Sequence, residues 1–260
     1  MTILSQLMTN TELEEAIKEL LWSASDAIMK IYQQGHLVID LKADHSPVTH
    51  ADLAAHEIIT KGLQLLTPDI PIMSEEDPTS LNLPEFHNVF WLIDPLDGTK
   101  EFIKRNDEFT CNVALVEDHR PTFGFVTIPA QGVLYSGGPG LGAFRGARGS
   151  DFDPIQCEPA QEITRIVASK SHLNEDTLAF IENIKTPTEL IQAGSSLKFL
   201  KIAEGNADLY PRLAPTCEWD TAAAQAILEG AGGSVTQING SPMRYGKDNI
   251  LNPHFVARGF

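Results

Sequence analysis

Apolar residues recur at intervals of three and four along the N-terminal segment, and this spacing predicts a long amphipathic helix from Thr11. The residues that would share its buried face are Leu13, Ala16, Ile17, Leu20, Ala24, Ala27, Ile28 and Ile31. Thr11 and Glu14 have the spacing of a capping box, and Gly35 provides a stop. A second helix is predicted to begin near Thr49 and to end before residues 67–69.

Short apolar runs follow at residues 70–73 and 89–93, and each predicts a buried strand that ends in acidic residues. Between Phe109 and Arg145 the chain changes to short β-rich runs separated by turn-forming sequences. This change of pattern predicts an antiparallel meander.

After residue 160, strand-like and helical runs alternate, which predicts a layered α/β half. The strand-like runs are 164–169 and 189–193, and the helical runs are 174–184, 195–205 and 219–230. The pattern changes between residues 150 and 160. We therefore expect an N-terminal half, 1–155, with most of the acidic motifs, and a C-terminal half, 156–260.

Composition is that of an ordinary soluble globular protein, with 42% hydrophobic and 21% charged residues in a chain of 260. The 35 acidic residues outnumber the 19 basic ones, which gives a formal charge of −16. This charge argues against a general affinity for nucleic acid polymers or for an anionic membrane surface. An anionic substrate would need local positive charge.

The location of the protein is predicted from its cysteines and its N-terminus. The three cysteines are few and lack CxxC spacing, so a reducing compartment is the simpler interpretation. Acidic residues stand where a signal peptide would carry basic ones, and no apolar run reaches the roughly 18 residues of a transmembrane helix. We expect a cytoplasmic protein without a transmembrane segment, and peripheral membrane association stays open.

Acidic residues follow predicted elements in three separate places. Glu75 and Glu76 come after the first short strand, Asp94 and Asp97 after the second, and Asp220 stands in the first turn of the last predicted helix. A single aspartate after a strand is usually a helix cap or a turn former. Carboxylates from three elements can instead converge on one point, where a hard cation such as Mg²⁺ would neutralise them.

The sequence around the second acidic pair also suits a phosphate. Pro95 restricts the backbone, so that both aspartates and the Leu96 carbonyl can face the same side. Gly98-Thr99-Lys100 is predicted to begin a helical turn whose free N–H groups can hold phosphate oxygens.

The motifs "SEED", "DPLDGTKEF" and "WDTAA" occur in this order, and in this respect the chain resembles the inositol monophosphatase family of lithium-sensitive, Mg²⁺-dependent phosphatases. With "DHSPVTHAD", "GSSLKF" and "AEGNADLYPR" it more closely resembles the CysQ-type 3′(2′),5′-bisphosphate nucleotidases of that family. The resemblance implies an α/β (α+β) fold, a layered αβαβα sandwich of the inositol monophosphatase and sugar phosphatase type. It also implies removal of the 3′-phosphate from 3′-phosphoadenosine 5′-phosphate, which gives AMP and phosphate.

Metal ligands and catalytic residues are implied by the same resemblance. Two or three Mg²⁺ ions would be held by Glu75, Asp94, the Leu96 carbonyl, Asp97 and Asp220. Asp52 and Thr99 would orient and deprotonate a metal-activated water that attacks phosphorus directly, without a phosphoenzyme. Glu76 would support the ligands, and Lys42 would lie nearby.

Substrate contacts are implied both at the metal site and in the C-terminal half. They are Glu75, Leu96, Asp97, Gly98, Thr99, His172, Ser195, Lys198, Arg212 and Asp220. The adenosine and its 5′-phosphate would be held by those in the C-terminal half, together with Ser169 and Lys170. Glu218 departs from the pattern, because an acid before the tryptophan resembles the inositol-type enzymes.

Other functions stay open at this point. The segment "LIDPLDGT" superficially resembles the D-x-D-G-T motif of haloacid-dehalogenase-type phosphatases, but its spacing is D-x-x-D and its position is mid-chain. A broader inositol or sugar-phosphate monoesterase and a non-catalytic Mg²⁺- or phosphate-binding module are further alternatives. The sequence does not give the oligomeric state or the breadth of substrates.

Overall fold

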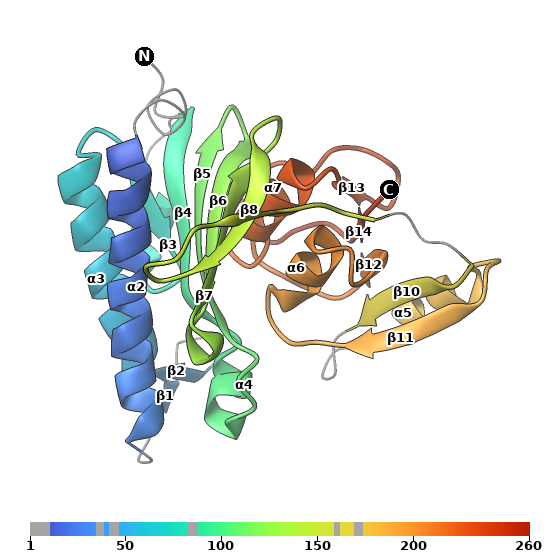
Figure 1. Cartoon of the computed structure of the whole chain (residues 1–260), viewed down its shortest axis with the longest axis horizontal. Helices are drawn as coiled ribbons and strands as arrows, with labels where there is room; N and C mark the ends of the chain where they lie inside the picture. Colours follow the sequence, from blue (N-terminus) through green and yellow to red (C-terminus); the bar gives the residue numbers. More distant parts are fainter. Residues whose placement is uncertain (1–10, 35–38, 42–46, 83–87, 159–161, 169–173) are drawn as a thin grey trace.

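The computed structural model describes residues 11–34, 39–41, 47–82, 88–158, 162–168 and 174–260. Within these ranges helices and sheets stack in the order helix, sheet, helix, sheet, helix (Figure 1). The layered αβαβα arrangement predicted from the resemblance is therefore confirmed. No helix of the described part is long and apolar enough to cross a membrane.

The outer helical layer consists of α2 (Thr11–Gln33) and α3 (His50–Leu66), which lie side by side on one face of the larger sheet (Figure 1). Ile17 and Leu21 of α2 and Ile59 and Leu63 of α3 are fully buried between them and the sheet. Both helices were predicted from their apolar spacing. The predicted Thr11 cap and the Gly35 stop lie outside the described side chains and residues.

The larger sheet has seven strands in the order β3-β4-β5-β6-β7-β8-β9. Its strands are β3 (Ile72–Ser74), β4 (Val89–Asp97), β5 (Thr110–Glu117), β6 (Arg120–Ile128), β7 (Val133–Gly138), β8 (Gly142–Ala147) and β9 (Asp153–Ile155). β3 and β4 are parallel, and every later neighbouring pair is antiparallel, so the predicted meander is confirmed.

Strand β4 continues farther than predicted. Its expected end after Ile93 is wrong, because β4 includes both Asp94 and Asp97. Asp94 is opposite Asn112 and Asp97 is opposite Thr110, with a register shift between the two pairs. Pro95 has no N–H for the sheet, so the pairing is interrupted where the two acids leave the regular ladder.

A second helical layer lies between the two sheets and consists mainly of α6 (Leu197–Ala203) and α7 (Ala222–Gly230) (Figure 1). Gly124 of β6 allows α7 to approach the larger sheet, because a Cβ at this position would lie 2.1 Å from the Ala223 carbonyl oxygen. Asp220 was predicted in the first turn of this helix. That prediction is wrong, since α7 begins at Ala222 and Asp220 belongs to the preceding turn.

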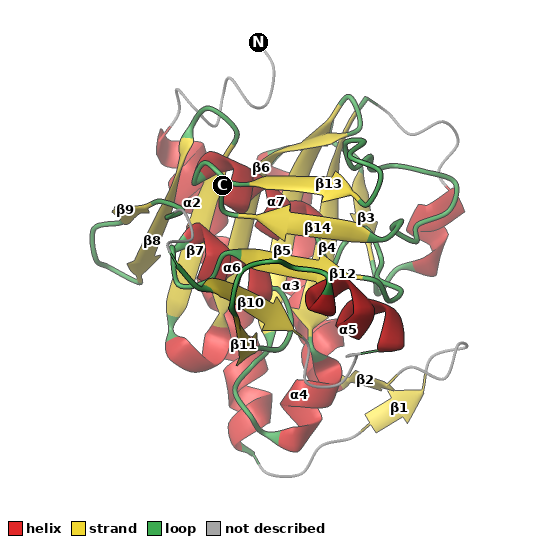
Figure 2. Cartoon of the chain, turned by 90° about the vertical axis from the view of Figure 1, so that its right-hand side faces the viewer, coloured by secondary structure: helices red, strands yellow, loops and turns green. Residues whose placement is uncertain are grey.

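The smaller sheet has five strands in the order β11-β10-β12-β14-β13, which lie in front of the larger sheet in Figure 2. The strands are β10 (Thr164–Ala168), β11 (Thr188–Gln192), β12 (Leu209–Arg212), β13 (Ser234–Gln237) and β14 (Phe255–Arg258). Helix α5 (Glu175–Glu182) covers its outer face through Ile181. β10, β11 and α5 were predicted, whereas β12, β13 and β14 were not.

Several small elements complete the described chain and were not predicted, apart from the turn at Gly98. They are β1 (Ile39–Leu41), β2 (Pro47–Thr49), two 3₁₀ turns, Pro78–Asn82 and Pro129–Gln131, and the short helix α4 (Thr99–Lys104) that follows Gly98. The division into halves at residue 155 stays a prediction. Both halves contribute to one hydrophobic cluster, in which β5 and β6 of the larger sheet pack against α7, and α7 packs against α6.

Candidate metal and catalytic site

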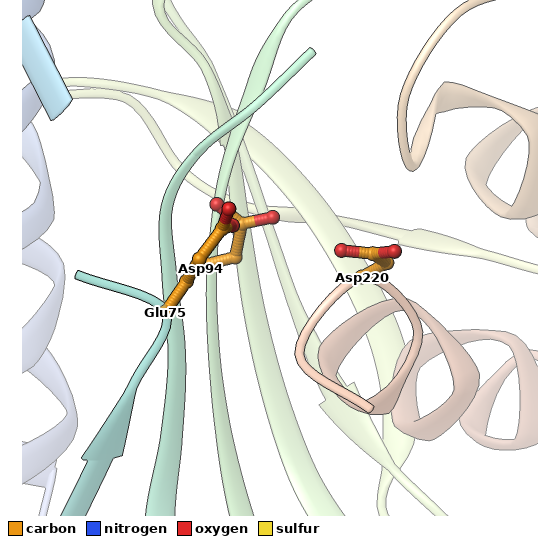
Figure 3. A group of neighbouring side chains, drawn as sticks. All are labelled: Glu75, Asp94 and Asp220. Atoms are coloured by element: carbon orange, nitrogen blue, oxygen red, sulfur yellow. The ribbon is translucent and has the colours of Figure 1, made fainter. Parts of the chain in front are cut away.

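Three carboxylates meet where β3, β4 and the turn before α7 come together. One oxygen each from Glu75, Asp94 and Asp220 lies within 4.8 Å of the other two. Figure 3 shows Glu75 just after the end of β3, Asp94 on the neighbouring strand β4, and Asp220 opposite them in the turn that precedes α7. The structure thus brings together acids that are far apart in the sequence, and the predicted convergence of carboxylates from three elements is confirmed for these residues.

The electrostatics of this cluster favour a bound cation. Asp94 is buried, and burial raises its pKa well above the ordinary value, with a further increase from the charges of Glu75, Asp97 and Asp220. Burial also raises the pKa of Asp220 to about 8, together with the charges of Asp97 and Glu75. Carboxylates this close disfavour one another's ionisation unless positive charge is present.

The hydrogen bonds of Asp94 leave one oxygen without a protein donor. Its Oδ1 accepts from the Leu96 N–H at 3.0 Å, while its buried Oδ2 accepts no hydrogen bond from the described residues. A buried oxygen in this state costs free energy unless something else pairs with it. An all-oxygen carboxylate set with such a free atom fits a hard divalent cation such as Mg²⁺.

Asp97 lies beside this group but outside the set of three whose oxygens are mutually close. Its Oδ2 accepts hydrogen bonds from the hydroxyls of Ser195, at 2.7 Å, and Ser196, at 3.1 Å. Asp220 is held by a backbone donor instead: its Oδ2 accepts a hydrogen bond from the N–H of Cys217 at 2.8 Å. Both carboxylates are therefore fixed in direction by their own surroundings.

Thr99 and Asp52 form the pair that the resemblance implied. The Thr99 hydroxyl lies 3.2 Å from Oδ1 of Asp52 and 3.4 Å from the Leu96 carbonyl oxygen. Oδ2 of Asp52 accepts from the backbone N–H of Thr49 at 2.8 Å and from its hydroxyl at 2.6 Å, so it also completes the capping box of α3. Burial raises the pKa of Asp52 in spite of these hydrogen bonds.

Gly98 makes the turn that presents Thr99. Its φ of +94° lies in the left-handed region, where a Cβ is strained, and it precedes the first residue of α4. The predicted helical turn at this glycine is confirmed. That its N–H groups hold phosphate stays a prediction.

The predicted nucleotide contacts occupy different surroundings. Lys198 is buried. Its Nζ donates to the Ser195 carbonyl at 2.5 Å, and burial lowers its pKa to about 8.

The Arg212 guanidinium donates to the carbonyls of Ala214, at 3.1 Å, and Pro215, at 2.7 Å. Ser195 contacts Asp97, as above. His172, with Ser169, Lys170 and Lys42, lies outside the described residues.

Glu218, the departure noted in the sequence, is fixed by contacts within the protein. Its side chain is fully buried, accepts from the backbone N–H of Gly246 at 2.6 Å and of Lys247 at 3.2 Å, and forms an ion pair with the Lys247 ammonium. These contacts direct its carboxylate to Gly246 and Lys247.

The sequence analysis did not identify Thr110, Asn112 and Ser196 at the site, although Ser196 is the second serine of the motif "GSS" and was therefore visible.

Comparison with known proteins places the chain in a family. The model of the inositol monophosphatase family matches residues 9–258. A 3′(2′),5′-bisphosphate nucleotidase CysQ from Escherichia coli K12 is 43% identical over 244 residues, which cover 93% of this chain and 97% of the relative. A CysQ from Haemophilus influenzae is 30% identical over 262 residues, with 97% and 95% covered.

Solved structures agree with the sequence comparison. The crystal structure of CysQ from Bacteroides thetaiotaomicron superposes with a TM-score of 0.83 at 38% identity, over 94% of this chain and 96% of that one. The chain belongs to the inositol monophosphatase family, whose members are metal-dependent phosphatases. Within that family it is similar to the CysQ-type bisphosphate nucleotidases, and the resemblance read from its motifs is confirmed.

Proposed function

We propose that this chain is a Mg²⁺-dependent 3′(2′),5′-bisphosphate nucleotidase that converts 3′-phosphoadenosine 5′-phosphate into AMP and phosphate. The observation that carries the proposal is the meeting of Glu75, Asp94 and Asp220 beside the Thr99–Asp52 pair. The relatives named CysQ supply the substrate class. The protein would act in the cytoplasm on a small nucleotide rather than on a nucleic acid polymer, and its oligomeric state stays open.

The residues that would hold two or three Mg²⁺ ions are Glu75, Asp94, the Leu96 carbonyl, Asp97 and Asp220. The unpaired Oδ2 of Asp94 and the raised pKa values of Asp94 and Asp220 support this assignment. When bound, the ions would lower the pKa of a water and neutralise charge on the phosphate and the departing ribose oxygen. Hydrolysis of phosphate monoesters is among the slowest uncatalysed reactions, so positioning alone is insufficient.

Thr99 and Asp52 would direct the attacking water. Because the Thr99 hydroxyl hydrogen is donated to Asp52, its oxygen lone pairs are free to accept a hydrogen bond from that water. A proton lost from the water can then pass through Thr99 to Oδ1 of Asp52. The raised pKa of Asp52 makes this carboxylate a better proton acceptor than an exposed aspartate. Phosphorus is attacked directly, so no phosphoenzyme forms.

Selectivity for a bisphosphate would come from cations beside the metal ligands. Lys198 and Arg212 are close enough for the arginine charge to lower the pKa of the lysine. In a chain of charge −16 such a pair gives the local positive charge that a 5′-phosphate needs. Ser195 and His172 complete the contacts implied by the resemblance.

A steady-state assay tests the proposal. Purified protein with Mg²⁺ is given 3′-phosphoadenosine 5′-phosphate, 3′-phosphoadenosine 5′-phosphosulfate, inositol 1-phosphate, inositol bisphosphates and 3′-AMP, and released phosphate is measured. We expect the highest kcat/KM with 3′-phosphoadenosine 5′-phosphate and no activity in excess EDTA. Equal kcat/KM values across the panel would instead support a broader inositol or sugar-phosphate monoesterase.

The remaining alternatives are weaker. The chain's membership of the inositol monophosphatase family argues against a haloacid-dehalogenase-type phosphatase, and an acid-stable phosphoenzyme trapped from the reaction would reverse that judgement. A non-catalytic phosphate-binding module is disfavoured by the Thr99–Asp52 pair beside the acidic cluster. Absence of turnover with every ester, despite Mg²⁺ binding, would favour that module.

A further inference from the structure

Four polar side chains, three of them buried, form a hydrogen-bonded network behind Asp97 that takes no part in the proposed proton transfer. Thr110 and Asn112 belong to β5, and Ser195 and Ser196 immediately precede α6. Thr110, Asn112 and Ser196 are at most 1% exposed. Burying polar groups costs free energy unless they are paired, so a network of this size in a protein core requires an explanation.

The network reaches a single oxygen of Asp97 by two routes. In the first, the Thr110 hydroxyl lies 2.7 Å from the Ser195 hydroxyl, which lies 2.7 Å from Oδ2 of Asp97. An ionised carboxylate only accepts hydrogen bonds, so Ser195 donates to Asp97 and Thr110 donates to Ser195. The Ser195 hydroxyl is also 2.9 Å from the Asp97 carbonyl oxygen.

The second route has its direction fixed by an amide. The side-chain N–H of Asn112 donates to the Ser196 hydroxyl at 3.0 Å. The hydrogen of Ser196 is then available to two acceptors, each 3.1 Å away: Oδ2 of Asp97 and the carbonyl oxygen of Asp220. Ser196 therefore joins the chain segments that carry two of the proposed ligands.

Strand geometry explains why these residues face the site. Thr110 and Asn112 are two positions apart on β5, so their side chains project from the same face of the sheet. They are opposite Asp97 and Asp94, respectively, on β4. The register shift between these pairs gives β4 one extra residue between the two acids, where Pro95 interrupts the ladder.

We propose that Ser195 and Ser196 are positioning residues, which with Thr110 and Asn112 hold Oδ2 of Asp97 so that its Oδ1 is presented to a cation. Among the described residues Oδ1 accepts no hydrogen bond, in contrast to Oδ2 with its two serine donors. Ser195 would thus orient Asp97 in addition to making the nucleotide contact expected from the sequence. The inference rests on the proposed function, since it takes Asp97 and Asp220 as ligands of Mg²⁺.

Ser196→Ala is the first test, and the readout is Mg²⁺ binding to substrate-free protein by titration calorimetry. Loss of a group that orients a metal ligand weakens metal binding by about 10- to 100-fold, and we expect a loss of this size. Ser25→Ala is the matched control, because it removes a buried hydroxyl hydrogen bond, 3.0 Å from Thr127, on the opposite face of the larger sheet. The control should bind Mg²⁺ as the unmodified protein does.

Ser195→Gly provides a second variant that does not depend on the tolerance of the core for Ser196→Ala. Ser195 has a φ of +50°, a conformation that glycine adopts without strain, so the substitution removes the hydroxyl while favouring the native backbone. Relief of backbone strain offsets part of the cost of leaving the buried Thr110 hydroxyl without Ser195, so we expect a folded variant with weakened Mg²⁺ binding. Unchanged Mg²⁺ binding with a raised KM for the nucleotide alone would overturn the inference and leave Ser195 as a substrate contact only.

A double-mutant cycle tests the relay itself. If Asn112 acts through Ser196, then Asn112→Ala should weaken Mg²⁺ binding in the unmodified protein but add little when Ser196 is already alanine. Additive losses would overturn the relay. If the unmodified protein binds no Mg²⁺, the proposed function fails as well; if it binds Mg²⁺ and Ser196→Ala binds equally well, only the positioning role is overturned.

Discussion

Asp52 accepts the Thr99 hydroxyl hydrogen on one carboxylate oxygen and caps helix α3 with the other. The two functions fix the carboxylate in place: the backbone N–H and the hydroxyl of Thr49 hold Oδ2, and Oδ1 faces Thr99. A side chain that would look like an ordinary helix cap in isolation is thereby joined to the start of α4, 47 residues farther along the chain.

Thr99→Ala is expected to lower kcat by about 10²-fold or more and to leave KM nearly unchanged, because a group that takes part in proton transfer acts in the transition state. Thr99→Ser keeps the hydroxyl and serves as the control, with most of the activity retained. Steady-state kinetics at saturating Mg²⁺ measure both parameters. An effect of Thr99→Ala on KM alone would show that Thr99 only holds the phosphate.

Asp220→Asn is expected to lower turnover by orders of magnitude and to stabilise the metal-free protein. The folded-state pKa of Asp220 is raised from 3.8 to about 8, so in the absence of metal this group favours the folded state below pH 4, and this contribution is lost as the pH rises through about 8. The amide stays neutral and removes part of this dependence.

Thermal melts between pH 5 and 9 in EDTA measure this effect. The Tm of the unmodified protein should fall with rising pH, Asp220→Asn should show a smaller fall, and Mg²⁺ should raise the Tm of the unmodified protein most at high pH. Near-normal turnover of Asp220→Asn, or identical melting profiles of the two proteins in EDTA, would contradict the ligand assignment.

Hydrophobic periodicity was sufficient for much of the fold. The apolar stripes of α2 and α3 and the β-rich runs of β5 and β6 are local patterns, and they predicted these elements correctly. Strand β12 is only four residues long and contains Pro211, so its local sequence carries little strand signal. It exists because Leu209 and its neighbours pair with β10 and β14.

In the candidate site, too, some features follow from the local sequence and others depend on contacts between distant segments. The convergence of Glu75, Asp94 and Asp220 could be predicted, because acids that follow apolar runs are visible in the sequence even where the end of the strand is misplaced. The burial of Lys198 and the contact of Asn112 with Ser196 depend instead on the tertiary packing that brings the start of α6 to β5. No spacing in the sequence reports that packing.

Glu218→Gln is expected to destabilise the protein without changing substrate preference. The buried carboxylate pairs with Lys247 and accepts two backbone N–H groups, so removing its charge leaves the Lys247 ammonium without its partner. Breaking a buried ion pair typically costs about 3 to 5 kcal/mol, and the partial exposure of Lys247 places the loss below that range. Urea unfolding measures the stability.

The matched comparison for Glu218→Gln is the ratio of kcat/KM for 3′-phosphoadenosine 5′-phosphate to that for inositol 1-phosphate. This ratio should equal that of the unmodified protein, because Glu218 is directed to residues 246–247 and away from the acidic cluster. A ratio shifted by tenfold or more, with stability unchanged, would show that Glu218 contacts the substrate after all.

Lys198 is expected to make selectivity for the bisphosphate dependent on pH. Its pKa is lowered to about 8, chiefly by burial, so the ammonium that would face a 5′-phosphate is lost as the pH rises through this value. The substrate phosphates have a second pKa near 6 and keep their charge over this range. The ratio of kcat/KM for 3′-phosphoadenosine 5′-phosphate to that for 3′-AMP should therefore fall between pH 7 and 9, while changes in the shared chemistry cancel.

Lys198→Ala removes that titration and should lower the ratio at pH 7 by roughly 10- to 150-fold, which corresponds to a charge-assisted phosphate contact of about 1.5 to 3 kcal/mol. Arg212→Ala should lower the ratio by a similar factor and keep a pH-dependent fall, shifted to higher pH, because Lys198 still titrates and loses a neighbouring positive charge that lowers its pKa. Lys201→Ala, at the second lysine of α6, is the matched control and should change neither quantity. Equal losses on both substrates for Lys198→Ala would mean that the lysine supports the packing around Ser195 instead, and the proposed activity would then broaden to sugar phosphates in general.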